Sequence, residues 1–240
     1  MDKIVSYTSK ESKTKQGVLW LIIAVDYMKK QGYFDFFDQI NVKMKEVNYS
    51  VKQKIITVMC SIVVCCGYTK DINNRLVPDE ATAEILGMKR FPDQSQINIL
   101  LRRFDENNIF ELKQAHESIF KNDSLSFSMN ETKIIDIDQT SLIANGKTYE
   151  FAEKGYFPKK KNQKGYKVSA SYLGNSKEAL SLYLEKGNTD EFANMENILN
   201  DIGKFYSPNS LKDIIVRADA GYGSERGIKL LKKIWGKIYN

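Results

Sequence analysis

The stretch IIDIDQTSL, residues 134–142, decides the fold of the C-terminal half of the chain. Its apolar and polar side chains alternate and many are β-branched, which is typical of a strand. Two more runs of this kind follow, GYKVSASYL at 165–173 and EALSLYLEKG at 178–187, separated by Gly174 and Asn175. The turn at these two residues predicts an antiparallel hairpin.

A helix is expected at about 190–205, followed by a fourth apolar strand, LKDIIVRAD at 211–219, and by a last helix from near Ser224. A crossover through a helix lets the fourth strand return parallel beside the first. In such open sheets, chemistry gathers at the carboxyl ends of the strands. We therefore expect Asp138 and Asp219, which lie at two of these ends, to meet at one edge of the sheet.

Two acids held close together raise one another's pKa and resist ionisation unless a cation joins them. Carboxylate oxygens with room for water and phosphate suit Mg²⁺ or Mn²⁺. Such ions activate a nucleophile and stabilise the leaving oxygen at phosphorus, so a phosphodiester-cleaving site is indicated. Asp136 shares a strand face with Asp138 and is a further candidate metal ligand. The alternative is that these acids cap turns, as Asp at a strand end commonly does.

Residues 14–120 contain successive segments with helical periodicity, and the polar stretch KNDSLSFSMNET at 121–132 ends this pattern. We therefore predict an α/β protein with an all-helical domain at 1–125 and a mixed sheet at 130–240. That second domain has three antiparallel strands, a helix, a parallel fourth strand and a helix.

Two candidate DNA-binding elements stand out. The helices at 80–86 and 93–104 have helix-turn-helix proportions, and the second carries Arg102 and Arg103, which contact either phosphate or only solvent. The basic segment KGYFPKKKNQKGYK at 154–167 holds six lysines and no acid. Lysines bind phosphates in a salt-sensitive way, and aromatic rings stack on unpaired bases. This segment is therefore a candidate DNA contact, and the alternative is that it is a solvated loop. The candidates in this segment are Tyr156, Lys159, Lys160, Lys161, Lys164 and Lys167.

Composition excludes several other classes of protein. The balance of 36 Lys and Arg against 30 Asp and Glu favours a polyanionic partner. Cys60, Cys65 and Cys66 lie in one apolar helical stretch, a poor disulfide or metal arrangement, and His116 is the sole histidine, which excludes a zinc site of several imidazoles. The apolar runs are shorter than the ~20 residues of a bilayer span. A cytoplasmic protein without a membrane segment is expected.

The C-terminal half resembles the DDE transposases of bacterial insertion sequences. IIDIDQTSL resembles their first motif, with Asp138 as the first catalytic carboxylate and Thr140 two residues on. IIVRADAGYGSE at 214–225 is similar to their second motif, with Asp219 as the second carboxylate. LEKGNTDE at 184–191 resembles the segment in which their third strand ends in Gly-Asn. The resemblance implies a ribonuclease-H-like fold, Mg²⁺ or Mn²⁺, and cutting and joining of DNA.

The same resemblance implies terminal inverted repeats and target DNA as partners, a homodimer or mixed multimer, and a bacterial, nucleoid-associated location. The family's third acid, a Glu in a Tyr-Arg-Glu-Lys-like motif, has no match before WGKIYN at 235–240, and Glu225 lies too close to the fourth strand to replace it. The sheet is therefore expected to be incomplete and the chain truncated. The alternatives are an active transposase, an inactive DNA-binding remnant that inhibits the full-length enzyme, and a separate ribonuclease-H-like nuclease.

Overall fold

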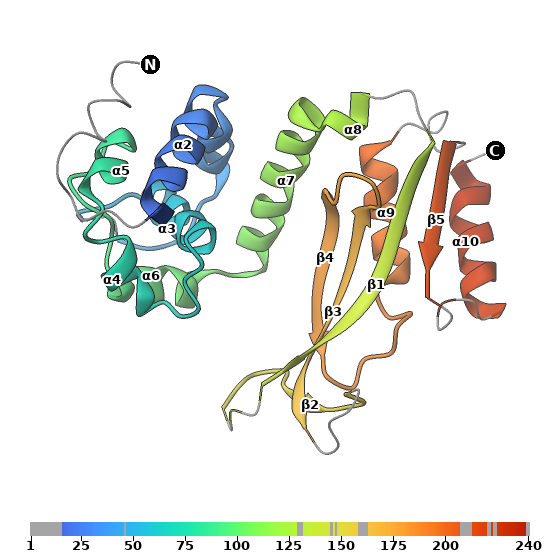
Figure 1. Cartoon of the computed structure of the whole chain (residues 1–240). Helices are drawn as coiled ribbons and strands as arrows, with labels where there is room; N and C mark the ends of the chain where they lie inside the picture. The colour runs from blue at the N-terminus through green and yellow to red at the C-terminus, as the bar shows by residue number, and fades with distance from the viewer. Residues whose placement is uncertain are drawn as a thin grey trace. The chain divides into compact units, whose positions relative to one another are not determined.

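The computed structural model describes residues 16–45, 47–128, 132–144, 146, 148–157, 163–206, 213–219, 222 and 225–238 (Figure 1). The chain divides into two compact units, Met1–Ile119 and Phe120–Asn240. The basic residues Lys159, Lys160 and Lys161 lie outside the described residues.

The first unit is helical, as the sequence predicts (Figure 1). Its core is formed by apolar side chains from most of its elements, among them Leu21, Phe37, Ile55, Phe91 and Leu100. No helix in the described part of the chain has both the length and the apolarity to cross a bilayer. The elements are α2 (Gln16–Lys30), the 3-10 helix η1 (Tyr33–Gln39), α3 (Val51–Val63), α4 (Asp71–Arg75), α5 (Glu80–Ile85), α6 (Gln94–Arg103) and α7 (Glu106–Asp123).

The helix that carries the arginine pair begins where the sequence predicts. Asp93, after Pro92, is the N-cap of α6, and its carboxylate accepts hydrogen bonds from the backbone N–H groups of Ser95 at 2.9 Å and Gln96 at 3.1 Å. Such a cap satisfies N–H groups that have no partner inside the helix. The hydrogen bond from the Ser95 hydroxyl, followed by that from Gln96, lowers the pKa of Asp93.

The second unit contains a mixed sheet that confirms the predicted strand order. β1 pairs antiparallel with β3, β3 pairs antiparallel with β4, and β5 lies parallel beside β1. The two-residue strand β2 pairs with the start of β3 and was not predicted, because it is too short to show the alternation of a strand. The elements are α8 (Leu125–Ser128), β1 (Lys133–Ile143), β2 (Glu153–Lys154), β3 (Lys164–Leu173), β4 (Ala179–Lys186), α9 (Met195–Phe205), β5 (Ile214–Ala218) and α10 (Glu225–Ile238).

Strand alternation gives the sheet a face that α9 covers. Ile135 and Ile137 of β1 are buried in one cluster with Ile198, Leu199 and Ile202 of α9. α9 packs on β4 and α10 packs on α9. The two polar neighbours of Ile137 in sequence, Asp136 and Asp138, therefore point to the other side of β1. This alternation puts both acids on the same face of the strand.

Candidate active site

Asp138 and Asp219 lie side by side where the pairing of two parallel strands ends. Asp219 directly follows β5, whereas Asp138 lies in the middle of β1 and not at its carboxyl end, because β1 continues along β3 to Ile143. The register of β1 and β5 places Ile137 opposite Ala218, and the next residue of each strand is one of the two aspartates. Paired strands lie about 4.8 Å apart. Both aspartates are exposed. The fold thus brings together two carboxylates that are far apart in sequence, at an edge that solvent and substrate can reach.

These two side chains fit a hard divalent cation. Mg²⁺ is commonly held by one or two carboxylates, with waters and substrate phosphate filling the remaining positions. Two exposed acids side by side on adjacent strands leave such positions open. Among the residues that the structure describes, no three acidic, histidine or cysteine side chains converge closely enough to hold a metal ion.

Asp136 faces a different partner from the one that the sequence suggested. Its carboxylate accepts two hydrogen bonds from Arg217 of β5, at 2.5 Å from Nε to Oδ1 and 2.9 Å from Nη2 to Oδ2. Asp136 and Arg217 are also directly paired in the strand register. The hydrogen bond from Arg217 lowers the pKa of Asp136, and its charge acts in the same direction. Both oxygens of Asp136 are therefore occupied, and its placement favours a structural role.

This ion pair predicts a specific dependence of stability on pH. Because Arg217 lowers the pKa of Asp136 below its ordinary 3.8, the stabilisation is present above about pH 4 and is lost as the pH falls through the lowered value. In Arg217→Met, the free energy of unfolding should be lower at pH 6 and should fall less steeply towards pH 2.5. Urea unfolding at a series of pH values measures both. Arg226→Met, which removes an exposed ion pair of 3.9 Å with Asp190, should leave the pH profile unchanged.

A buried polar network supports the middle of β1, next to Asp138. Glu185 of β4 is buried, and its carboxylate accepts hydrogen bonds from Gln139 and Ser169, both at 2.9 Å, and from the amide of Asn194. Gln139 directly follows Asp138, so this network fixes the strand beside the candidate catalytic residue. Glu185 was not among the candidate residues that the sequence pattern indicated. The available signal was an acid at an inward position of an alternating strand.

The described residues of the basic segment differ in their surroundings. Tyr156 is 81% exposed and Lys164 is exposed. Lys167 is buried, and its ammonium donates hydrogen bonds to the Ser141 hydroxyl at 2.9 Å and the Tyr156 carbonyl at 2.7 Å. An ammonium engaged in this way inside the unit is poorly placed for phosphate. The alternation of β3 turns Lys167 inwards, which a count of lysines does not reveal.

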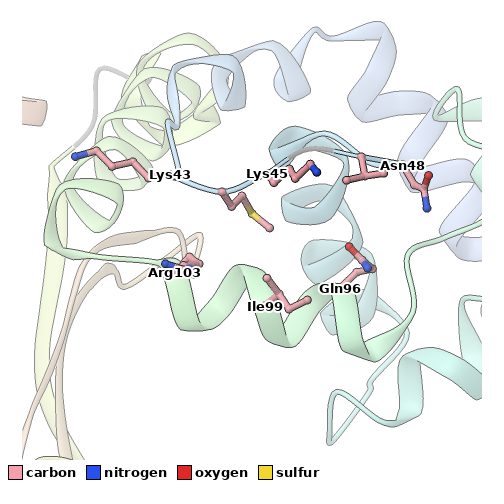
Figure 2. Close-up of a pocket in the computed structure, with 8 residues that line it drawn as sticks. Lys43, Lys45, Asn48, Gln96, Ile99 and Arg103 are labelled. Atoms are coloured by element: carbon pink, nitrogen blue, oxygen red, sulfur yellow. The ribbon is translucent and has the colours of Figure 1, made fainter.

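The helical unit contains a basic groove of about 680 Å³. Figure 2 shows Lys43, Lys45 and Asn48 on the segment that precedes α3, opposite side chains of α6. Gln96, Ile99 and Arg103 of α6 recur at three- and four-residue steps and so share one helix face. This open surface combines positive charges, an amide and an apolar side chain, which are groups that can contact the phosphates and bases of nucleic acid. The full lining is Lys43, Met44, Lys45, Val47, Asn48, Gln96, Ile99 and Arg103. Arg102 is exposed but does not line the groove.

A mixed sheet with two acids side by side on adjacent parallel strands is an arrangement that can hold a metal ion. Residues 129–235 match the family described as the transposase DDE domain. This match covers most of the second unit and agrees with its mixed sheet.

Comparisons beyond this family are weak. No curated protein matches the chain. Among solved structures, the chain is similar at 12% identity to a pre-cleavage Mos1 transpososome, over 81% of this chain and 60% of that one, with a TM-score of 0.27. It is similar at 13% identity to the Mos1 mariner paired-end complex with Mn, over 97% and 69% of the two chains, with a TM-score of 0.28. The chain thus spans 60% of the length of the first, and likenesses this low carry no weight for function.

Proposed function

We propose that this chain binds the ends of a bacterial insertion sequence and cuts and joins DNA phosphodiesters at Asp138 and Asp219. A transposase role follows from the DDE domain. The observation that supports the catalytic assignment is the register of β1 and β5, which puts the two acids next to one another. Their exposure leaves room for a phosphate of double-stranded DNA, first at a terminal inverted repeat and then at a target site.

In this proposal the carboxylates of Asp138 and Asp219 are the ligands of Mg²⁺ or Mn²⁺. A cation held by these two residues would supply activation of the attacking hydroxyl and stabilisation of the leaving 3′ oxygen. The hydrogen bond from Gln139 to Glu185 holds β1 in place beside Asp138. Lys164, at the start of β3, offers a positive charge to the DNA backbone. Asp136 and Lys167 are left out of the site because protein groups already occupy them.

A cleavage assay tests this function. Labelled duplexes that carry the flanking inverted repeats should be cut by the full chain with Mg²⁺ or Mn²⁺, and the addition of EDTA should stop the reaction. Products without cation, or cutting that continues in EDTA, would remove the metal-dependent mechanism.

A second candidate is DNA binding without catalysis, as an inhibitor of an active transposase within a mixed multimer. It is favoured by the finding that no three potential ligand side chains converge among the described residues. Under this alternative the chain retains duplex binding, yields no cut product with either cation, and slows an active transposase added to the same DNA.

The basic segment gives a separate prediction about DNA contact. Replacing Lys159, Lys160 and Lys161 by Gln should weaken binding to duplex DNA and reduce its salt dependence. Each lost phosphate contact reduces the magnitude of the slope of log affinity against log salt by roughly 0.9. The slope of the triple variant should therefore be smaller in magnitude by about 2.7. Fluorescence anisotropy from 50 to 300 mM NaCl measures this slope, and an unchanged slope would assign these lysines to solvent.

A further inference from the structure

Two adjacent cysteines, Cys65 and Cys66, lie outside the helix in which the sequence placed them. α3 ends at Val63, and Val64 is its C-cap. Neither thiol belongs to a disulfide, and Cys65 is exposed while Cys66 is half-buried. The expectation of one helical stretch through all three cysteines was therefore wrong, and two neighbouring thiols lie in a turn at the surface of the helical unit.

The backbone at the end of α3 fixes the position of the two thiols. The N–H of Cys66 donates to the carbonyl of Ser61 at 2.8 Å, and the N–H of Cys65 donates to the carbonyl of Ile62 at 3.0 Å. This pair of hydrogen bonds is a Schellman motif, in which the residue after the C-cap adopts the left-handed conformation. Cys65 occupies that position, with a φ of 56°. Glycine is the usual residue there, because any side chain strains a left-handed backbone.

Side chains of α4 hold the rest of this turn. The guanidinium of Arg75 donates to the carbonyl of Val64 at 2.7 Å. The carboxylate of Asp71 accepts hydrogen bonds from the N–H groups of Gly67 at 2.9 Å and Tyr68 at 3.0 Å. The backbone is thus held on both sides of the cysteine pair. Only the two side chains need to rotate for both sulfurs to reach one atom.

A pair of thiols without further ligands selects a particular class of partner. Within the described ranges, no group of three potential ligand side chains gathers around these sulfurs, so a closed zinc site is not formed. Cys60 cannot serve as a third thiol, because burial raises its pKa to about 12. A trivalent arsenic atom that carries one organic substituent has two positions left for sulfur, the soft ligand that such elements prefer. The exposed side chains of Ile62 and Tyr68, close by in sequence, suit an aromatic substituent.

We propose that Cys65 and Cys66 form a binding site for a trivalent arsenic compound with one organic substituent. Each thiol displaces one hydroxyl group from arsenic. Two S–H and two As–O bonds break, two As–S bonds form, and the thiol protons leave with the hydroxyl groups as two molecules of water. Arsenic stays trivalent, so the step needs no oxidant or reductant. The site goes beyond the proposed function and does not depend on it, because all of its residues belong to the helical unit.

The test is titration of the reduced full chain with phenylarsine oxide, whose hydrated form is such a compound. Mass spectrometry of the intact protein counts the phenylarsenic groups that stay bound in an excess of glutathione. One group per chain should be retained, because the second bond to sulfur forms within the same molecule and so competes well with a free monothiol. The dithiol 2,3-dimercaptopropanol should remove it.

Cys65→Gly separates loss of the site from loss of the fold. Glycine suits the left-handed position, so this variant should unfold at the same or a higher temperature than the unchanged chain. It should nevertheless bind phenylarsine oxide about 100-fold more weakly or worse, since the gain from joining two binding groups is lost. Cys66→Ser should lose as much. Cys60→Ala is the matched control, because it removes the buried thiol and should bind within about twofold of the unchanged chain.

The accessibility of the remaining thiol supplies a second readout. In Cys66→Ser, N-ethylmaleimide should modify the exposed Cys65 as fast as in the unchanged chain. The loss of arsenical binding is then due to the missing second sulfur and not to a distorted turn. Slow modification of Cys65 in the unchanged chain would overturn the proposal, because this thiol would not be open to a ligand.

Three further results would overturn the proposal. The first is retention of the phenylarsenic group by Cys65→Gly or Cys66→Ser as well as by the unchanged chain. The second is its loss in Cys60→Ala, which would make the buried thiol a ligand. The third is a lower unfolding temperature of Cys65→Gly, since the turn would then lack the left-handed geometry that positions the pair. None of these results bears on DNA cutting, so the two proposals fail separately.

Discussion

Asp138→Asn and Asp219→Asn should each abolish cation-dependent DNA cutting while leaving the fold intact. An amide keeps the size of the carboxylate but loses the negative charge that holds a hard cation. A metal ion contributes several kcal/mol to such a reaction, and each 1.36 kcal/mol is tenfold in rate, so a loss of about 1000-fold is expected. Both side chains are exposed, and the unfolding temperature in EDTA should not fall.

The measurement is the initial rate of strand cleavage with saturating Mg²⁺ or Mn²⁺. Glu153→Gln is a suitable control, because it removes one exposed acid on β2 and should leave the rate within about twofold. Cutting at the normal rate in either aspartate variant would withdraw the assignment of these two residues. A loss of cutting together with a lower unfolding temperature would instead indicate a structural role for the aspartate.

Neutralising the basic groove of the helical unit should weaken DNA binding and reduce its dependence on salt. Lys43 and Arg103 lie on opposite walls of the groove (Figure 2). If both contact phosphate, the double change to Gln lowers the slope of log affinity against log salt by about 1.8. Binding to a labelled inverted-repeat duplex between 50 and 300 mM NaCl gives this slope.

A matched variant separates this effect from a change in net charge. Lys30→Gln with Lys70→Gln removes two exposed lysines of the same unit that do not line the groove. This control should shift the slope by much less than the groove variant. Equal shifts would show that the groove has no special part in binding. In that case Gln96→Ala would not change which DNA sequence the chain prefers.

The order of strands and helices was predictable because it depends on local patterns. Alternation identified β1, β3 and β4, and the long connection before β5 required a parallel return. Asp138 and Asp219 were therefore expected side by side before their register was known. The expectation that Asp138 ends its strand was wrong, because β1 continues along β3 to Ile143. The match of residues 129–235 to the transposase DDE domain confirms the family that these motifs suggested.

Partners across strands were not predictable, because they depend on register. Asp136 meets Arg217 only because these residues are opposite one another on β1 and β5. The inward direction of Lys167 and the network around Glu185 likewise require a known register. Tyr222 was visible as the aromatic residue of a motif, but its burial depends on packing against α9 and the Phe192 ring.

The ion pair between Asp136 and Arg217 joins residues that are 81 positions apart, and it holds the last strand of the sheet to the first. Contacts of such long range form slowly, because the entropy of the intervening chain is lost before they stabilise anything. We therefore expect Asp138 and Asp219 to come together late in folding. A chain caught before that closure has its hairpin of β3 and β4 but not the pair of acids, so the proposed cation site forms only when folding is complete.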